Sequence, residues 1–299
     1  MGGFLQGLNE NSFTYLRVQV DMTICIVTDI SCDLPQEIIR ENKITVVTLF
    51  INIGDQSYLD GVDLSHQEFY ERLPGFKLAP KTAAPGPDVF RKVFEQLASE
   101  GATDILSIHV SSKLSALADI TRTVARETTR MPVTVFDSRQ LSLGTGFQVM
   151  AAAEAAARGL ARNEILSLLE KLIRRIRVFA ALDTMEYLRR SGRVNFAISA
   201  LGTLLQIKPF MKMYNGELTA ERVRTRHGAM KRLVELLEEY GPYEKVALLH
   251  SHARQRAEAL LQEVSGLLPE GEIWVEEITP VLGALIGPGV IGFACISKE

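Results

Sequence analysis

The sequence contains few cysteines and lacks long apolar runs. Its 299 residues include three cysteines, Cys25, Cys32 and Cys295, which show no metal-binding or redox spacing. This argues against a disulfide framework and favours reduced thiols, so we expect a cytoplasmic protein. No apolar run reaches the length of a membrane-spanning helix. Residues 1–21 lack the hydrophobic segment of a signal peptide, and we expect them to form a poorly ordered N-terminal extension.

The chain also lacks a long basic stripe. The formal net charge is −3, and 23% of the residues are charged. The densest basic cluster, 222–232, is interrupted and faces a balancing acidic run, so it predicts a solvated helix face. Because nucleic-acid binding requires a basic surface that neutralises several phosphates, we expect no nucleic acid partner.

The first half of the chain alternates short β-rich runs with helical patterns. This alternation predicts an N-terminal α/β domain, residues 22–159, with a mainly parallel sheet. The expected strands are 24–28, 45–53, 105–110 and 133–136. Polar residues follow several of them, and open sheets of this kind bind ligands beyond the carboxyl ends of their strands.

The second half, residues 160–299, predicts another α/β domain, with the boundary near Gly159. Asn215-Gly216 separates two β-rich runs and is a strong signal for a two-residue hairpin turn. Helical patterns at 228–240 and 254–267 alternate with strand patterns at 245–250, 273–278 and 290–297. We therefore expect a mixed sheet that includes a β-hairpin.

The predicted binding site is centred on the stretch 105–123. An apolar strand run leads to Ser111-Ser112, and apolar residues recur at helical spacing beyond it. We therefore expect Ser111 or Ser112 to be the N-cap of a helix, with Ser115 in the first turn. Unpaired backbone N–H groups, the helix dipole and these hydroxyls then form a candidate anion site. Helix capping alone is the alternative role of the serines.

Three further segments bear on ligand binding. Thr82 lies in a stiff proline-rich loop, 80–87, which can hold a hydroxyl against a ligand or serve as a plain surface turn. Arg190 and Arg193 offer guanidinium groups to a carboxylate, a phosphate or a partner, unless they only solvate a helix end. The glycine-rich segment 283–292 lacks the features of a phosphate loop. Because the histidines lack a third ligand in sequence reach, we expect no metal and no cofactor.

A serine-dependent hydrolase or acyltransferase acting on an acyl substrate is the alternative function. Asp29, Asp137 and His109 share the first domain with Ser111 and Ser112, either of which could be the nucleophile of a Ser-His-Asp triad. However, the chain has no G-x-S-x-G nucleophile elbow. His109 also lies within an apolar strand, where a histidine is more often buried, with its ring nitrogens hydrogen-bonded inside the protein, than catalytic.

Taken together, these segments resemble the DegV family from about residue 23 to residue 297. The matching stretches, in the family's order, are VTDISCDLP (27–35), DGVDLSHQEFYERL (60–73), KTAAPGP (81–87), SSKLS (111–115), FDSRQLSLGTG (136–146), LDTMEYLRRSGRV (182–194), LLQIKPF (204–210) and GPGVIG (287–292). The resemblance implies a carrier, not an enzyme, in which two α/β domains enclose one long-chain fatty acid. In family members called FakB, the carboxylate is presented to a separate kinase, and a FakA-like kinase is therefore an implied partner.

The resemblance also implies roles for particular residues. The family's carboxylate contacts fall on Thr82 and on the Ser111-Ser112 turn, which the residue patterns had also selected. Its R-x-G-R segment falls on Arg190 to Arg193, and these arginines are expected near the ligand entrance or the kinase surface.

Two positions depart from the family's pattern. Ala116-Leu117 stands where the family usually has Gly-Thr, which implies a narrower or reshaped acyl channel. Leu285 stands where a histidine usually helps to hold the carboxylate. Leucine can neither donate a hydrogen bond nor carry a charge. Either the head group is held only by Thr82, the serines and the helix N-terminus, which we favour, or the ligand lacks a carboxylate and the chain has left the kinase-linked role.

Overall fold

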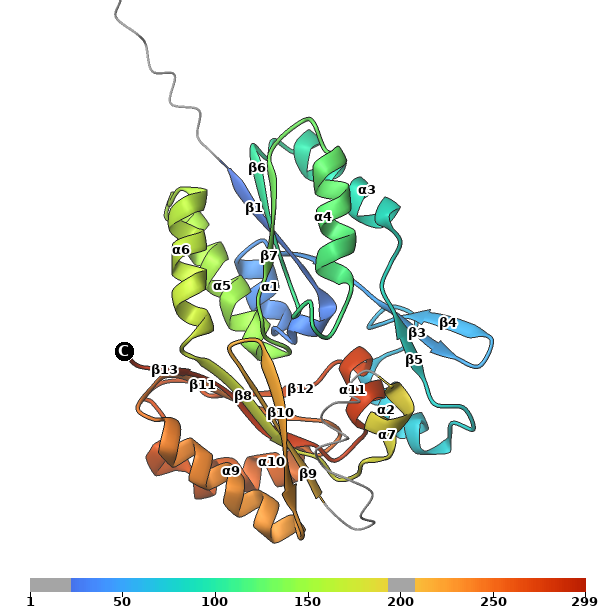
Figure 1. Cartoon of the computed structure of the whole chain (residues 1–299), viewed down its shortest axis with the longest axis vertical. Helices are drawn as coiled ribbons and strands as arrows, with labels where there is room; N and C mark the ends of the chain where they lie inside the picture. The colour runs from blue at the N-terminus through green and yellow to red at the C-terminus, as the bar shows by residue number, and fades with distance from the viewer. Residues whose placement is uncertain (1–22, 193–207) are drawn as a thin grey trace, which may run out of the picture.

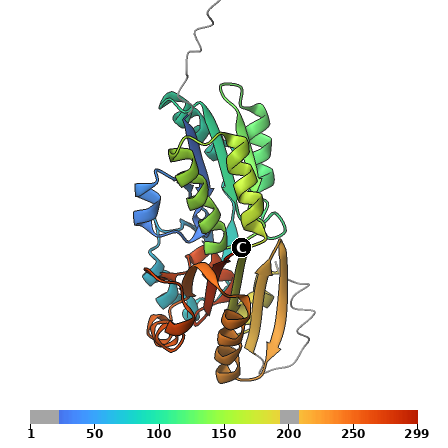
Figure 2. The same cartoon turned by 90° about the vertical axis from the view of Figure 1, so that its left-hand side faces the viewer.

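The computed structural model describes residues 23–192 and 208–299. They form two α/β halves, each built on its own sheet and stacked one above the other (Figures 1 and 2). This confirms the predicted fold class. The predicted N-terminal extension, residues 1–21, lies outside the described residues.

A four-stranded parallel sheet forms the centre of the first half. Its strand order is β2-β1-β6-β7. The strands are β1 (Ile24–Asp29), β2 (Thr45–Val47), β6 (Asp104–His109) and β7 (Val133–Asp137). The helices that cover it are α1 (Gln36–Glu41) and α5 (Leu143–Ala157) on one face and α3 (Pro87–Ser99) and α4 (Leu117–Glu127) on the other. Strand β6 is buried along its whole length, as its apolar run implies.

The run 45–53 does not form the single strand that its composition predicts. Strand β2 ends at Val47, and β3 (Phe50–Ile53) belongs to a separate antiparallel sheet with β4 (Gln56–Leu59) and β5 (Lys81–Ala83). The prediction of a bare proline-rich loop is also wrong, because β5 lies within it. An apolar run does not show where the chain moves from one sheet to another. Helix α2 (His66–Arg72) follows β4.

The second half contains a six-stranded mixed sheet in the order β10-β9-β8-β13-β11-β12. Its strands are β8 (Ile176–Ala181), β9 (Lys208–Tyr214), β10 (Glu217–Val223), β11 (Tyr243–His250), β12 (Trp274–Glu277) and β13 (Ile291–Ser297). Only the β11–β12 pair is parallel among its strand pairs within the described residues. The predicted hairpin is confirmed: Asn215 and Gly216 have φ of 47° and 80°, and they connect β9 to β10.

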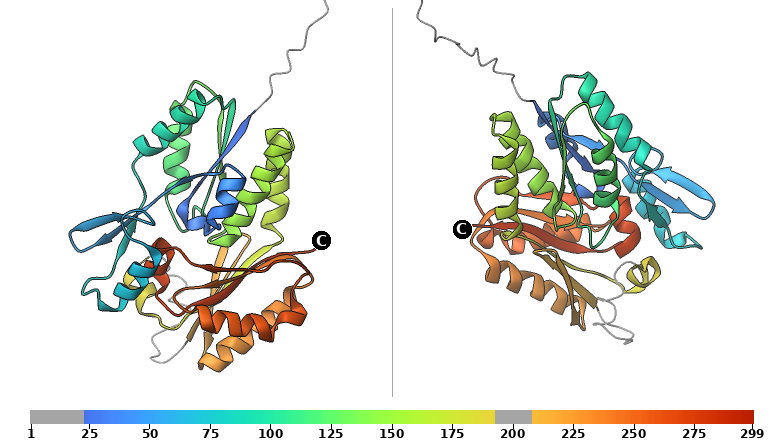
Figure 3. Two further views of the ribbon diagram at one scale, coloured as in Figure 1. Left: turned by 180° about the vertical axis from the view of Figure 1, so that it is seen from behind. Right: turned by 45° about the horizontal axis from the view of Figure 1, so that its top comes forward.

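Helices cover both faces of the second sheet. α9 (Arg226–Tyr240) and α10 (Arg254–Glu263) pack on its outer face, and α5 reaches its inner face (Figure 3). α6 (Arg162–Ile173) packs on α5 and joins the same hydrophobic cluster. The division of the chain near Gly159 stays a prediction, because this cluster includes residues from both sides of it.

Two short helices lie at one end of the second sheet, next to the three-stranded sheet (Figure 1). They are α7 (Glu186–Ser191) and α11 (Pro280–Ile286). The glycines of residues 283–292 indicated a sharp turn or a close approach of the backbone before the last strand, and did not indicate a helix, but the first of these residues belong to α11. The glycines obscure this helix in the sequence, although Gly283 is required there: a Cβ would come within 2.3 Å of the Tyr70 hydroxyl.

Candidate functional site

An apolar cavity lies between the two halves. The first half contributes residues from the ends of its strands, and the second contributes the inner face of β8 and β9 together with α11. The lining residues are Ser31, Leu49, Thr82, Val110, Leu114, Ser115, Leu117, Leu141, Ser142, Val178, Phe179, Ala180, Leu182, Leu188, Ser191, Met211, Met213, Leu218, Leu249, Ile278, Val281, Leu282, Leu285, Ile286 and Val290. Among these described residues, none is a lysine, arginine, histidine or acid.

The cavity is large enough for a ligand of many atoms. About 140 Å³ of it can hold the centre of a water molecule. Since one water needs 10–15 Å³ of such volume, the space could hold roughly ten waters or a comparable length of hydrocarbon. The residues of the second sheet are small at this point. Gly292 on β13 pairs with the cavity-lining Ala180 on β8, and a Cβ on Gly292 would come within 2.6 Å of the Ala180 side chain. An apolar cavity of this kind with a few hydroxyls is typical of a small-molecule site.

The Ser111-Ser112 turn does not cap a helix. Helix α4 begins only at Leu117, and its N-cap position, Ala116, makes no side-chain capping bond. The N-cap prediction is therefore wrong, because the chain forms a hydrogen-bonded turn after β6 before the helix starts. Ser111 is buried and Ser112 is exposed, and neither lines the cavity, whereas Ser115 does.

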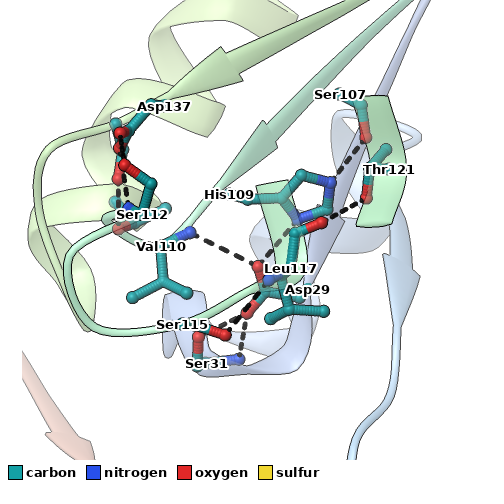
Figure 4. Close-up of polar contacts among 12 residues, drawn as sticks. Asp29, Ser31, Ser107, His109, Val110, Ser112, Ser115, Leu117, Thr121 and Asp137 are labelled. Carbon is teal, nitrogen blue, oxygen red and sulfur yellow. Dashed lines mark hydrogen bonds and ion pairs between the residues drawn. The ribbon is translucent and has the colours of Figure 1, made fainter. Parts of the chain in front are cut away.

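The hydrogen-bond donors of this turn are used within the protein. Ser112 donates both its N–H (3.3 Å) and its hydroxyl to Asp137. Ser111 accepts N–H groups from Lys113, Leu114 and Ser115 through its hydroxyl or its carbonyl oxygen. The Leu117 N–H donates to Ser115 Oγ at 3.3 Å (Figure 4). These bonds consume most of the N–H groups that the sequence offered to an anion.

The other predicted site residues fall in different places. Thr82 on β5 and Leu285 on α11 are half-buried and line the cavity. Arg190 is exposed on α7 and pairs with Glu186 at 2.6 Å, away from the cavity wall. Arg193 lies outside the described residues. The structure thus brings together Thr82, Ser115 and Leu285 at one cavity.

The sequence patterns did not identify Ser31, which lies in the turn after β1 and faces the cavity. Its hydroxyl and its N–H (3.2 Å) both donate to Asp29 Oδ1 (Figure 4). Asp29 Oδ2 accepts the Val110 N–H (3.4 Å) and contacts His109 Nδ1 (2.9 Å). His109 in turn contacts Ser107 Oγ through Nε2 at 2.8 Å. A buried polar chain therefore runs from the cavity wall into the first sheet.

A second missed residue, Ser142, is held in the same way by another carboxylate. Its hydroxyl donates to Asp33 Oδ2, while Asp33 Oδ1 accepts the Thr279 N–H at 3.0 Å. Burial raises the pKa of Asp33 to about 6, although both hydrogen bonds act to lower it. The DLP motif and the serines were visible in the sequence, but only folding shows that Asp33 and Ser142 meet.

The contacts of His109 bear on the hydrolase alternative. Ser107, His109 and Asp29 are aligned like a catalytic triad, but all three are fully buried and none lines the cavity. Ser111 and Ser112 bond to other groups and not to His109. A triad requires a nucleophile that reaches the substrate, so this chain of contacts orients side chains instead of presenting a reactive oxygen.

Within residues 23–192 and 208–299, no group of three or more His, Cys, Asp and Glu side chains is arranged to hold a metal ion. In the same part of the chain, no helix has the length and apolar character needed to cross a membrane.

These features define a class of protein: two stacked α/β halves with an apolar, hydroxyl-bearing cavity between them. The profile of a family described as "Uncharacterised protein, DegV family" matches residues 23–298. A DegV domain-containing protein of Streptomyces coelicolor is 32% identical over 92% of this chain and 99% of its own. The chain belongs to the DegV family.

Solved structures of relatives share this fold. A DegV family protein from Thermus thermophilus, described by its fatty acid binding, is 32% identical, with a TM-score of 0.84 over 93% of this chain and all of that one. DegV from Bacillus subtilis, described as a fatty acid binding protein, is 27% identical, with a TM-score of 0.85 and the same coverage. The predicted resemblance is thereby confirmed.

Proposed function

We propose that this protein binds one long-chain fatty acid in the cavity between its two halves. The observation that carries this proposal is the cavity itself, whose walls are apolar apart from a few hydroxyls. Each methylene group removed from water contributes about 0.8 kcal/mol, so a long acyl chain gains on the order of 10 kcal/mol. The fatty acids bound by relatives of the same fold support this ligand class.

Native mass spectrometry of protein purified from cells tests this function. We expect a non-covalent complex whose added mass equals that of a fatty acid and which dissociates on gentle activation. A covalent adduct on a serine would instead support the hydrolase or acyltransferase, and protein that stays empty after incubation with fatty acids would refute the carrier function.

We assign the head group to the end of the cavity that bears Thr82 and Ser115, close to Leu285. Ser115→Ala is expected to weaken fatty-acid binding by about 1–2 kcal/mol, because a buried polar head group loses one hydrogen bond. Ser112→Ala is the matched control, since Ser112 points to Asp137 outside the cavity. Isothermal titration calorimetry measures both affinities, and equal affinities in the two variants would refute the assignment.

We further propose that the protein delivers its bound fatty acid to a partner protein. The resemblance supports a carrier that works in the cytoplasm, performs no catalysis itself and presents its head group to a separate FakA-like kinase. Arg190 is exposed beside the cavity-lining Leu188, where it is accessible to such a partner. Formation of acyl phosphate from the loaded protein, ATP and a bacterial fatty acid kinase tests this step, and its absence with a kinase active on its own carrier would exclude it.

A further inference from the structure

The cavity hydroxyls differ in what they can offer a ligand. Asp29 receives the hydroxyl and N–H of Ser31, the N–H of Val110 and a contact from His109 Nδ1. A carboxylate surrounded by donors acts only as an acceptor, so the Ser31 proton is committed to it. What Ser31 presents to the cavity is therefore an oxygen lone pair.

Ser142 follows the same rule, because its proton is committed to Asp33. Ser115 is the complement: its oxygen accepts the Leu117 N–H, and no contact within the described residues uses its proton. Ser31 and Ser115 follow the paired strands β1 and β6, and both line the cavity (Figure 4). This end of the cavity thus has an acceptor beside a donor.

A carboxylate anion finds little to stabilise it here. No cationic side chain lines the cavity in the described part of the chain, and Leu285 on α11 offers neither a charge nor a hydrogen bond. The N–H groups of the Ser111–Ser115 turn are largely bonded within the protein. Burying an unpaired charge is costly, so an acid in such a site tends to keep its proton.

Resting on the proposed function, we infer that the cavity binds the fatty acid as the neutral, protonated carboxylic acid. The O–H of the acid donates to Ser31 Oγ, and its carbonyl oxygen accepts the Ser115 hydroxyl. A carboxylate would place its negative charge against the lone pair of Ser31 and in front of Asp29. A fatty alcohol can make the same donation to Ser31, and it is therefore a second expected ligand.

The charged groups behind this end of the cavity do not favour a bound carboxylate. Behind Ser31 stand Asp29 and its partner His109, and behind Ser142 stands Asp33. On the α11 side, Asp60 holds the Val281 N–H at 2.9 Å, with His66 Nε2 3.6 Å from its other oxygen.

Several cations of the second half contact carboxylates near the cavity. Beside the cavity-lining Leu182, Asp183 contacts Lys208 (3.4 Å), Arg226 (2.9 Å) and Arg256 (3.6 Å). On α7, Arg190 pairs with Glu186. Asp183 offers one negative charge to three cations, so this cluster is net positive. None of these described cations lines the cavity, however, so none offers the head group a direct contact.

Carboxyl carbon-13 NMR of labelled oleic acid bound to the delipidated protein tests the inference directly. We expect the bound carboxyl carbon to keep the chemical shift of the protonated acid at pH 7. The apparent affinity should fall about tenfold per pH unit from pH 6 to 8, because only the neutral fraction of the free acid binds. Oleyl alcohol should bind with an affinity that does not depend on pH.

A carboxylate chemical shift at pH 7, together with an affinity that does not change with pH, would overturn the inference while leaving fatty-acid binding intact. A protein that binds no oleic acid at any pH would instead refute the proposed function. Leu285→His gives a further check, because it adds the missing cation beside the head group. This variant is expected to bind the ionised acid and to lose less affinity between pH 6 and 7 than the wild type.

Discussion

Ala180→Phe is expected to lower the affinity for a long-chain fatty acid by about 100-fold or more. Ala180 lies on β8 in the cavity wall, opposite Gly292, so a phenyl ring there projects into the space for the acyl chain. Displacing about four methylene groups costs roughly 3 kcal/mol, which corresponds to two orders of magnitude in affinity. Calorimetric titration with oleic acid measures the loss.

Graded variants separate cavity blocking from misfolding. Ala180→Leu should lose less affinity than Ala180→Phe, and both should melt near the temperature of the empty wild-type protein, because they fill a void instead of creating one. Ala161→Phe, on the exposed N-cap position of α6, controls for the added aromatic ring. Full affinity in the phenylalanine variant would mean that the acyl chain does not run past β8.

The contribution of Asp33 and Asp60 to the free energy of unfolding is expected to fall by several kcal/mol between pH 4 and pH 7. Burial raises the pKa of Asp33 to about 6 and that of Asp60 to about 7, against 3.8 for an ordinary aspartate. A carboxyl with a raised pKa binds its proton more tightly when folded, so the stability that each of these two groups contributes is fully present below about pH 4. It is lost as pH rises through the folded pKa, by on the order of 3 kcal/mol per group.

Asp60→Asn is expected to remove part of this pH dependence. The side-chain oxygen of Asn can still accept the Val281 N–H, and its NH₂ group can donate to His66 Nε2, which lies 3.6 Å from the unbonded Oδ1 of Asp60. His66 does not neutralise Asp60 at pH 7, because burial lowers the pKa of His66. Urea unfolding at pH 5 and 7.5 should show a smaller difference for the variant, and an unchanged difference would contradict the assignment to Asp60.

The alternating pattern was sufficient to predict the parallel sheet, the hairpin and the closing strand. These elements have strong local signals, such as the β6 apolar run and the Asn215-Gly216 turn. The change of sheet between β2 and β3 was not predictable in the same way, because it depends on which strand each segment meets. Helix α11 was missed because its glycine packs against Tyr70, a contact between distant parts of the sequence.

The candidate site was also only partly predictable from the sequence. Thr82 was selected from a stiff proline-rich loop and Ser115 from the serines that follow a strand, and the structure places both at the cavity. Ser31 and Ser142 could not be selected, because their roles depend on Asp29 and Asp33, whose hydrogen bonds form only after folding. The serine pair after β6 looked like a helix cap, but Ser112 donates to Asp137 and the Ser111 N–H donates to the Gln140 carbonyl oxygen.

Helix α5 packs against both sheets at once. It contacts β1 and β6 in the first half and β8 and β13 in the second, and its Phe147 ring lies 6.1 Å from the Trp274 ring of β12. Neither sheet can therefore separate from α5 without exposing apolar surface that the other also covers. Halves with independent cores would melt one after the other, whereas a shared helix couples them. Scanning calorimetry of the empty protein should accordingly record one endotherm whose calorimetric and van't Hoff enthalpies agree.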